Sequence, residues 1–317
     1  MILKHVLALA SRGRLSIMIF HRVVAKPDPL LPGEPSAEQF EALLKHVSSR
    51  FCVIPLAEGV RRLYDGTLPV GAMAITFDDG YADNLVVAAP ILRRLGIPAT
   101  VFIATGYLDG ECMFNDVVIE AIRSTTQREI DLAVIGLGTL PLESIGDRQS
   151  AIDRAIGAIK YLSPGERAER TQDIVRAGRV AVPSGLMMSR DSVRSLSGYG
   201  VDVGAHTITH PILATLPAAD AWREILESRQ DLQQMLQKPV DIFAYPNGGP
   251  GRDYDSEHVR MVREAGFTAA VTTAWGAASR SSDVLQLPRF TPWTRQPMKF
   301  DLLMLRNLRH RSERKAA

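Results

Sequence analysis

Short apolar runs alternate with amphipathic helical patterns along most of the chain. Eight runs have the length of strands and are rich in β-branched and aromatic residues. They span residues 15–21, 51–54, 72–78, 99–105, 201–206, 240–245, 267–273 and 285–290. Apolar strands that alternate with helices are typical of a parallel sheet or barrel crossed by helices. The pattern therefore predicts an α/β protein, and eight runs suit a (β/α) barrel.

Capping residues mark the helices between these runs. Ser36 and Gln39 form a capping-box pattern that opens a helix reaching about Ser48, and Gly66 ends a second helix that begins at Leu56. Three more helices end close to a glycine or a proline and are predicted at about residues 83–95, 220–237 and 257–265. Each helix lies between two predicted strands, as the barrel requires.

Residues 114–188 interrupt the alternation. The last helix predicted there has Ser163 as its N-cap and Pro164 at its first position. The predicted pieces are helices near 116–123, 147–162 and 164–177 and a short apolar segment near 130–137. We interpret the stretch as a helical insertion between the fourth and fifth strands, either a lid over a site or a stabilising excursion.

The two ends of the chain lie outside the barrel domain, which we place at residues 15–295. The N-terminal segment, residues 1–14, contains an apolar run of only five residues, which is short for a signal peptide and for a membrane span. Residues 296–317 form a basic tail, expected to be frayed from Arg306 onward, with a weak tendency to contact a membrane surface. We expect a soluble, cytoplasmic protein.

The composition is that of an ordinary globular protein. Of 317 residues, 46% are hydrophobic and 23% are charged, which excludes a disordered chain, a collagen-like fibre and a coiled coil. The 37 basic and 35 acidic side chains leave a net charge of +2, so no overall field attracts nucleic acid. Cys52 and Cys112 provide neither a disulfide scaffold nor a CxxC zinc site. A charged partner must therefore be bound by a local group of residues.

Ionisable side chains gather where the predicted strands end. In α/β barrels the loops at the C-terminal ends of the strands converge on one mouth, where functional groups lie. The residues at these ends are His21, Asp78, Asp79, His206, His210, Tyr245, Asn247 and Arg289.

Two of these strand ends offer groups for metal and acid–base chemistry. The neighbouring Asp78 and Asp79 point in opposite directions in an extended chain, so one can bind a metal and the other can act as a base. His206 and His210 can converge on one ion if the residues between them turn, and with a carboxylate they leave positions open, as in hydrolytic zinc sites. The alternatives are an Asp-Gly turn and two incidental histidines.

A proline-glycine turn follows Tyr245. Such a turn can direct a backbone N–H into the mouth of the barrel, where the N–H stabilises an oxyanion. A plain turn is the alternative.

In chain order, these motifs resemble those of the polysaccharide deacetylase family, also called the NodB homology domain or carbohydrate esterase family 4. The similarity runs from about residue 15 to residue 290. The matching segments are residues 76–80, followed by Tyr81, Asp83 and Asn84, and then residues 97–103, 206–210 and 243–248. The resemblance implies a distorted (β/α) barrel of seven or eight strands and metal-dependent removal of an N-acetyl or, less often, an O-acetyl group from a sugar.

The resemblance also implies roles for the residues. Asp78 is expected to be the catalytic base, and the metal ligands are expected to be Asp79, His206 and His210. Zinc is the expected ion, with cobalt, nickel, manganese or iron as alternatives. The backbone N–H of Tyr245 is expected to share the oxyanion with the metal. The implied partner is an N-acetylated glycan or glycolipid, and no nucleic acid is expected.

The sequence departs from the common family pattern in three places. No arginine precedes Pro246, so we expect Arg289 to approach and orient Asp78. The late Leu-His motif, which supplies the general acid in the family, is absent. Residues 17–23 resemble the N-terminal strand of a permuted branch that includes exopolysaccharide deacetylases. An early histidine replaces the missing acid in that branch, so we expect His21 to be the general acid here. The Asp-Trp motif has no match, and Trp275 either lines the sugar site or packs in a loop.

The expected activity is hydrolysis of a carbon–nitrogen bond other than a peptide bond, in exopolysaccharide or cell-surface glycan metabolism. Two alternatives remain open at this stage. One is a related hydrolase of a small cyclic amide, which uses the same metal and base. The other is a catalytically silent sugar-binding homologue, against which the intact aspartates and histidines argue.

Overall fold

The structure is a computed structural model that describes residues 2–110, 112–181, 184–291, 294, 296–310 and 316, with the backbone alone for residues 2–5. In this part of the chain, eight strands form one sheet in the order β1-β3-β4-β7-β8-β9-β10, with β2 beside β3. Their bounds are β1 (Ser16–Phe20), β2 (Cys52–Val53), β3 (Ala72–Phe77), β4 (Ala99–Ile103), β7 (Val201–Ala205), β8 (Ile242–Ala244), β9 (Ala269–Trp275) and β10 (Leu287–Arg289). Each corresponds to one of the predicted runs.

The sheet is parallel and nearly closes into a barrel, because β10 returns to β1. The N–H of Ile19 donates to the carbonyl oxygen of Phe290, and the N–H of Phe290 donates to that of Ile17. Every residue of β1, β3 and β4 is buried. Burial on both faces is expected where a packed barrel interior lies on one side and helices on the other. The predicted distorted barrel is confirmed, with β2 attached outside the ring.

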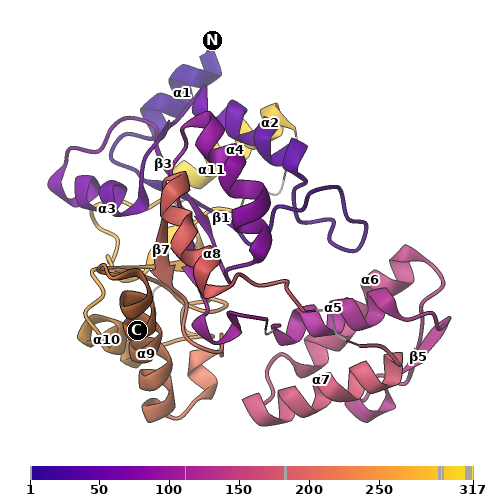
Figure 1. Ribbon diagram of the computed structural model, residues 1–317. Coiled ribbons are helices and arrows are strands. Elements are labelled where there is room, and N and C mark those ends of the chain that lie inside the picture. The colour runs from indigo at the N-terminus through magenta and orange to yellow at the C-terminus, as the bar shows by residue number, and fades with distance from the viewer. Residues whose placement is uncertain are drawn as a thin grey trace.

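The helices lie around the sheet (Figure 1). They are α1 (Ile2–Ala10), α2 (Ala37–Ser48), α3 (Leu56–Asp65), α4 (Ala89–Leu95), α8 (Arg190–Ser195), α9 (Ala218–Leu236), α10 (Ser256–Glu264) and α11 (Pro297–Arg309). The capping box of Ser36 and Gln39 is present, and Gly66 ends α3 with a left-handed φ of 76°. The helix predicted from Asp83 begins instead as a π-helical turn, Asn84–Ala88, ahead of α4. The sequence pattern did not predict α8.

The described part of the C-terminal tail is a packed helix, so the expectation of fraying from Arg306 is wrong for residues 306–309. Phe300, Met304 and Leu308 form a buried stripe with a spacing of four residues on α11. His46 of α2 and Arg50, which follows that helix, bind the carboxylate of Asp301 at 2.7 and 3.0 Å. Residues 311–315 and 317, which the prediction also covered, lie outside the described residues. Among the described helices, none combines the length and apolar character needed to cross a membrane.

The insertion forms a lobe beside the barrel (Figure 1). It contains α5 (Phe114–Ser124), α6 (Ile145–Ile159), α7 (Pro164–Gly178) and an antiparallel hairpin of β5 (Glu129–Asp131) and β6 (Thr139–Pro141). The hairpin stands where the apolar segment was expected. A separate hydrophobic cluster fills the lobe, with residues from all three helices and the hairpin. The lobe is therefore a folded unit with its own core.

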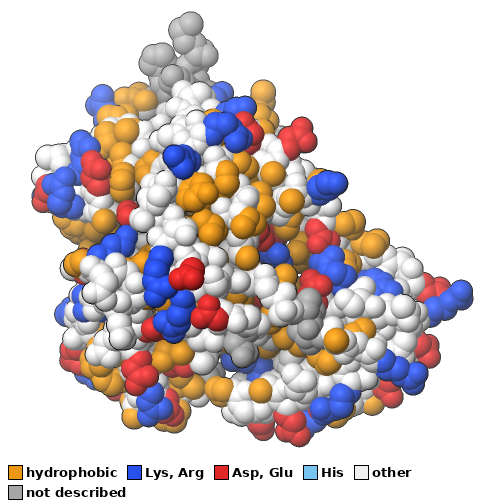
Figure 2. Space-filling model, in the orientation of Figure 1, with side chains coloured by type: hydrophobic (Ala, Val, Ile, Leu, Met, Phe, Trp, Pro, Cys, Tyr) orange, Lys and Arg blue, Asp and Glu red, His pale blue; other side chains and the backbone are white. Residues whose placement is uncertain are grey.

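The surface charges are mixed in sign. In Figure 2, Lys and Arg side chains are interspersed with Asp and Glu side chains over this face of the barrel and the lobe. This distribution accords with the net charge of +2.

Candidate active site

Asp78 and Asp79 follow β3, and both side chains face the imidazole of His206. Asp79 has a left-handed φ of 77°, so the chain turns between the two residues. Asp78 Oδ2 lies 3.9 Å and Asp79 Oδ1 lies 3.4 Å from Nε2 of His206. The expectation that the two side chains point in opposite directions is therefore wrong, because it assumed an extended backbone.

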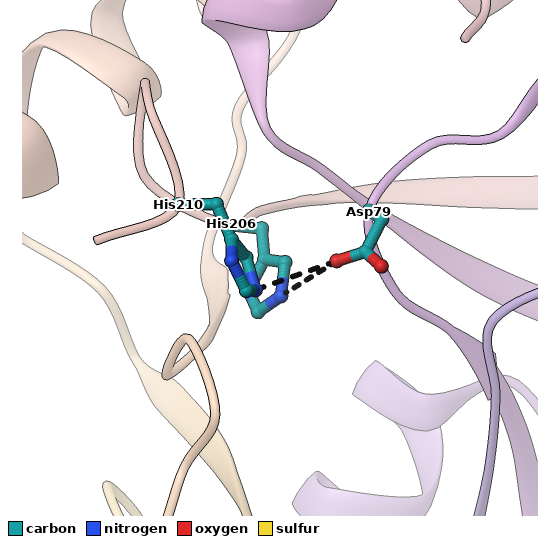
Figure 3. A group of neighbouring side chains, drawn as sticks. All are labelled: Asp79, His206 and His210. Carbon is teal, nitrogen blue, oxygen red and sulfur yellow. Dashed lines mark ion pairs between the residues drawn. The ribbon is translucent and has the colours of Figure 1, made fainter. Parts of the chain in front are cut away.

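The side chains of Asp79, His206 and His210 converge (Figure 3). Oδ1 of Asp79 lies 3.4 Å from Nε2 of each imidazole. The two histidines, which follow β7, meet through left-handed residues rather than a helical turn, with φ of 66° at Thr207 and 50° at His210. Parallel strands β3 and β7 thus bring one carboxylate and two imidazoles together across the mouth of the barrel.

This triad fits a divalent metal. Its three ligand atoms all lie within 4.8 Å of one another, and ligand atoms bound at about 2.0–2.2 Å around a tetrahedral zinc stand about 3.3–3.6 Å apart. Oδ1 of Asp79 is buried and accepts no hydrogen bond from the described residues. Nδ1 of His206 lies 2.7 Å from the carbonyl oxygen of Ala244, which leaves Nε2 to face the other ligands.

The electrostatics of the triad favour a cation. Burial raises the pKa of Asp79, but the two histidines outweigh burial and hold that pKa well below its usual range. Burial lowers the pKa of His210 to about 4, so its imidazole is neutral at neutral pH. For His206, burial lowers the pKa, but Asp78 and Asp79 attract positive charge and raise it overall. An ionised carboxylate and a neutral imidazole are the forms that bind metal.

Arg289 binds Asp78, as the sequence led us to expect. Nη1 and Nη2 of Arg289 donate to the two carboxylate oxygens of Asp78, each at 2.7 Å. The arginine is 1% exposed, and its Nε donates to the carbonyl oxygen of Thr272 at 2.8 Å. Burial raises the pKa of Asp78, but Arg289 and then His206 lower it, and the result lies below the usual value. Asp78 is thus held ionised and in one orientation.

His21 follows β1 and lies near both aspartates, since its charge contributes to the pKa of Asp78 and of Asp79. Its carbonyl oxygen accepts a hydrogen bond from Nδ2 of Asn84 at 2.9 Å. Next to it, Nε of Arg22 donates to Asp83 at 2.8 Å. A cavity of about 600 Å³ opens on this side of the mouth, and its lining includes His21, Glu34, Gln39 and Lys299.

The structure corrects the role expected of Tyr245. Its backbone N–H donates to the carbonyl oxygen of Val271 at 3.2 Å, in the ladder with β9, and is not available for an oxyanion. Its ring is fully buried and stacks on Tyr254 at 3.9 Å. In the turn that follows, Asn247 has a left-handed φ of 57°, and its N–H donates no hydrogen bond to any described residue.

Trp275 packs against the C-terminal helix. Its ring lies 5.1 Å from that of His310 and 6.1 Å from that of Phe290, and the guanidinium of Arg306 lies over it at 5.4 Å. These contacts support the packing alternative and give no support to a role in lining the sugar site.

Sequence reasoning missed Glu224, on α9. Its Oε2 accepts hydrogen bonds from the N–H groups of Ile208 at 2.7 Å and Thr209 at 2.8 Å, and its Oε1 accepts one from the Thr209 hydroxyl at 2.6 Å. Glu224 therefore holds the loop between His206 and His210. No motif marked it, because an acidic residue on a partly exposed helix face is ordinary.

A nearly closed (β/α) barrel with aspartates and histidines gathered at its mouth is the kind of site that hydrolases use. The sequence profile described as polysaccharide deacetylase matches residues 65–270, and the chain belongs to this family. The protein is a polysaccharide deacetylase, a hydrolase of carbon–nitrogen bonds other than peptide bonds. The matched range includes Asp78, Asp79, His206 and His210, whereas His21 and Arg289 lie outside it.

Individual relatives agree with this assignment. YxkH of Bacillus subtilis (strain 168), which is named as a polysaccharide deacetylase, is 22% identical over 279 residues, which cover 87% of this chain and 71% of that protein. The Streptococcus pyogenes deacetylase PplD, solved in complex with acetate, has a TM-score of 0.60 at 17% identity and covers 94% of this chain and 99% of its own. IcaB from Ammonifex degensii has a TM-score of 0.58 at 17% identity, over 92% and 95% of the two chains. These solved structures share the fold.

Proposed function

We propose that this polysaccharide deacetylase is a metal-dependent N-deacetylase that acts on an N-acetylated polysaccharide or glycolipid in exopolysaccharide or cell-surface glycan metabolism. The observation that carries the proposal is the triad of Asp79, His206 and His210 beside the Asp78–Arg289 pair. Zinc suits this ligand set, which leaves open positions as hydrolytic sites do. The deacetylase name of the structural relatives supports the reaction class.

The residues around the triad supply proton transfers and orientation. A divalent ion held by Asp79, His206 and His210 would polarise the acetyl carbonyl and lower the pKa of a water molecule. Asp78, ionised and held by Arg289, accepts a proton from the attacking water. His21 donates a proton to the amide nitrogen as the carbon–nitrogen bond breaks, so that acetate and an amine leave. For the backbone donor to the carbonyl oxygen we take the N–H of Asn247 rather than that of Tyr245, because it donates no hydrogen bond to any described residue.

The test is acetate release combined with metal analysis. Wild-type protein loaded with zinc is given N-acetylated chito-oligosaccharides, an O-acetylated sugar and a small cyclic amide, and Asp78→Asn serves as the blank. We expect acetate from the N-acetylated sugar, and a fall in kcat of about 10²–10⁴-fold in Asp78→Asn with the zinc content unchanged. Activity confined to the O-acetyl ester or to the cyclic amide, or equal activity with and without metal, would refute the proposal.

A further inference from the structure

Arg167, in the first turn of α7, is a largely buried cation that has no counter-ion among the described residues. The residue is 8% exposed, yet its guanidinium has no hydrogen-bond acceptor and no carboxylate partner among the described residues. The other buried arginine of the described chain, Arg289, is paired with Asp78 through two hydrogen bonds. Burial lowers the pKa of Arg167, and the phenol of Tyr107 alone opposes that effect.

Arg167 lies where the lobe meets the loop between His206 and His210, here named the metal-binding loop. Its guanidinium is 4.6 Å from the centre of the Phe114 ring, at the start of α5. It also lies near Tyr107, because its charge lowers the pKa of that phenol, which burial raises to about 12. The hydroxyl of Tyr107 donates to the carbonyl oxygen of Thr209 at 2.9 Å. Arg167 therefore lies near a side chain that binds the loop that carries His210.

The carboxylates of this region already have partners. Those whose charges act on Tyr107 are Glu224, Asp79 and Asp116. Glu224 accepts hydrogen bonds from the metal-binding loop, Asp79 faces the two imidazoles, and Asp116 accepts the hydroxyl of Tyr81 at 3.1 Å. None of them neutralises Arg167, so an anion that does so must come from outside the described chain.

The chemistry of arginine identifies that anion. A buried charge without a partner destabilises a fold, and such groups are normally paired or bind a ligand. The planar guanidinium donates two parallel hydrogen bonds that match a carboxylate or a phosphate, and an aromatic face such as that of Phe114 holds its plane. We propose that Arg167 binds an oxyanion, a carboxylate or a phosphate, that the glycan carries next to the acetylated group. This inference rests on the proposed function.

The test compares charged substrates with matched neutral ones. One pair is a disaccharide of glucuronic acid and N-acetylglucosamine with its methyl ester, and the other is N-acetylglucosamine 1-phosphate with its methyl glycoside. In wild-type protein we expect kcat/KM to be about 10- to 100-fold higher for the charged member of at least one pair. The pair that shows the preference tells whether the anion is a carboxylate or a phosphate. In Arg167→Gln that ratio should fall to about 1, mainly through KM.

Arg176→Gln is the matched control, because it removes an exposed arginine from the same helix. It should leave both ratios unchanged. Equal effects of the two substitutions would mean that only the net charge matters, and this would overturn the inference. A wild-type protein that prefers neither anion would also overturn it, and so would an Arg167→Gln variant that keeps the preference. If Arg167→Gln does not fold, Arg167→Lys replaces it, and we expect a smaller fall in the same ratio because lysine lacks the planar fork.

The two proposals fail in different ways. If the wild type hydrolyses the charged and the neutral member of each pair at equal rates, Arg167 has no such role and the deacetylase assignment stands. If zinc-loaded wild type releases acetate from no N-acetylated substrate, the proposed function fails and the inference fails with it.

Discussion

At the scale of single residues, the site depends on non-glycine residues in the left-handed region. Asp79, Thr207, His210 and Asn247 all have positive φ angles. Such a conformation costs about 1–3 kcal/mol for each residue and persists only where the surrounding structure enforces it. At Asp79 it turns two adjacent carboxylates toward His206, and at Thr207 and His210 it brings the second imidazole to Asp79. The strain is thus part of how the proposed ligands are oriented.

The salt bridge between Arg289 and Asp78 leads to a prediction about pH. Burial raises the pKa of Asp78, and Arg289 is the main group that lowers it. In Arg289→Gln the guanidinium is gone, so the pKa of Asp78 should rise. Asp78 is then protonated at a higher pH and cannot accept a proton, so the acid limb of kcat/KM should move to higher pH. The pH profile of acetate release measures this. Arg280→Gln, at an exposed position, is the control, and an unshifted acid limb in Arg289→Gln would show that the arginine does not set the protonation of Asp78.

At the scale of elements, α9 stabilises the loop that carries the two histidines. Its Glu224 binds two backbone N–H groups and one hydroxyl of the loop between His206 and His210. Groups that orient metal ligands in this way commonly contribute 10- to 100-fold to metal affinity. The helix therefore acts on the site without contacting the proposed ion.

Glu224→Ala should weaken zinc binding by about 10- to 100-fold, because Thr209 and Ile208 lose their acceptor and the loop that carries His210 loosens. Competition with a chelator measures the dissociation constant. At saturating zinc, kcat should recover most of its wild-type value, since Glu224 positions the loop and takes no part in proton transfer. Glu227→Ala, an exposed glutamate one turn further along α9, should bind zinc as the wild type does. Equal zinc affinity in both variants would rule out the positioning role.

How far the sequence predicts each element depends on whether its signal is local. The strands were predictable because apolar runs and their end residues are local features, and Arg289 could be proposed from its position at the end of the last strand. The N–H of Tyr245 was misassigned because pairing of β8 with β9 decides which amides are free. Glu224 and Arg167 gave no signal, since their partners or lack of partners arise only when distant segments meet. Trp275 was ambiguous for the same reason, because α11 packs against it.

At the scale of the whole molecule, the lobe is attached at the turn that carries the active-site aspartates. The N–H of Ala82 donates to the carbonyl oxygen of Leu186 at 2.8 Å, and the N–H of Met188 donates to that of Gly80 at 3.0 Å. The Tyr81 hydroxyl binds Asp116 of α5. Both connections of the lobe thus reach the segment that follows Asp79. The position of the lobe and the geometry of the turn that carries Asp79 are coupled through these contacts.

This attachment makes the stability of the protein depend on pH through Asp116. Its pKa is raised to about 7. Burial is the largest cause, the negative charges of Asp79 and Glu120 act in the same direction, and Arg22 and the Tyr81 hydroxyl oppose them. Between the ordinary pKa of about 4 and a pKa of about 7, the folded protein therefore binds a proton that the unfolded chain releases. Through Asp116, the free energy of unfolding should fall as the pH rises across this window and should level off above it.

Asp116→Asn replaces the carboxyl with a neutral group and should remove this dependence. Relative to wild type, its free energy of unfolding should increase by up to about 4 kcal/mol between pH 4 and pH 8. Urea unfolding followed by circular dichroism measures the difference. A chelator is present so that no bound metal ion offsets the negative charge of Asp79 in either protein. Asp131→Asn, at an exposed position in the same lobe, should give a curve parallel to that of the wild type. A parallel curve for Asp116→Asn as well would show that Asp116 does not couple protonation to the folding of the lobe against the barrel.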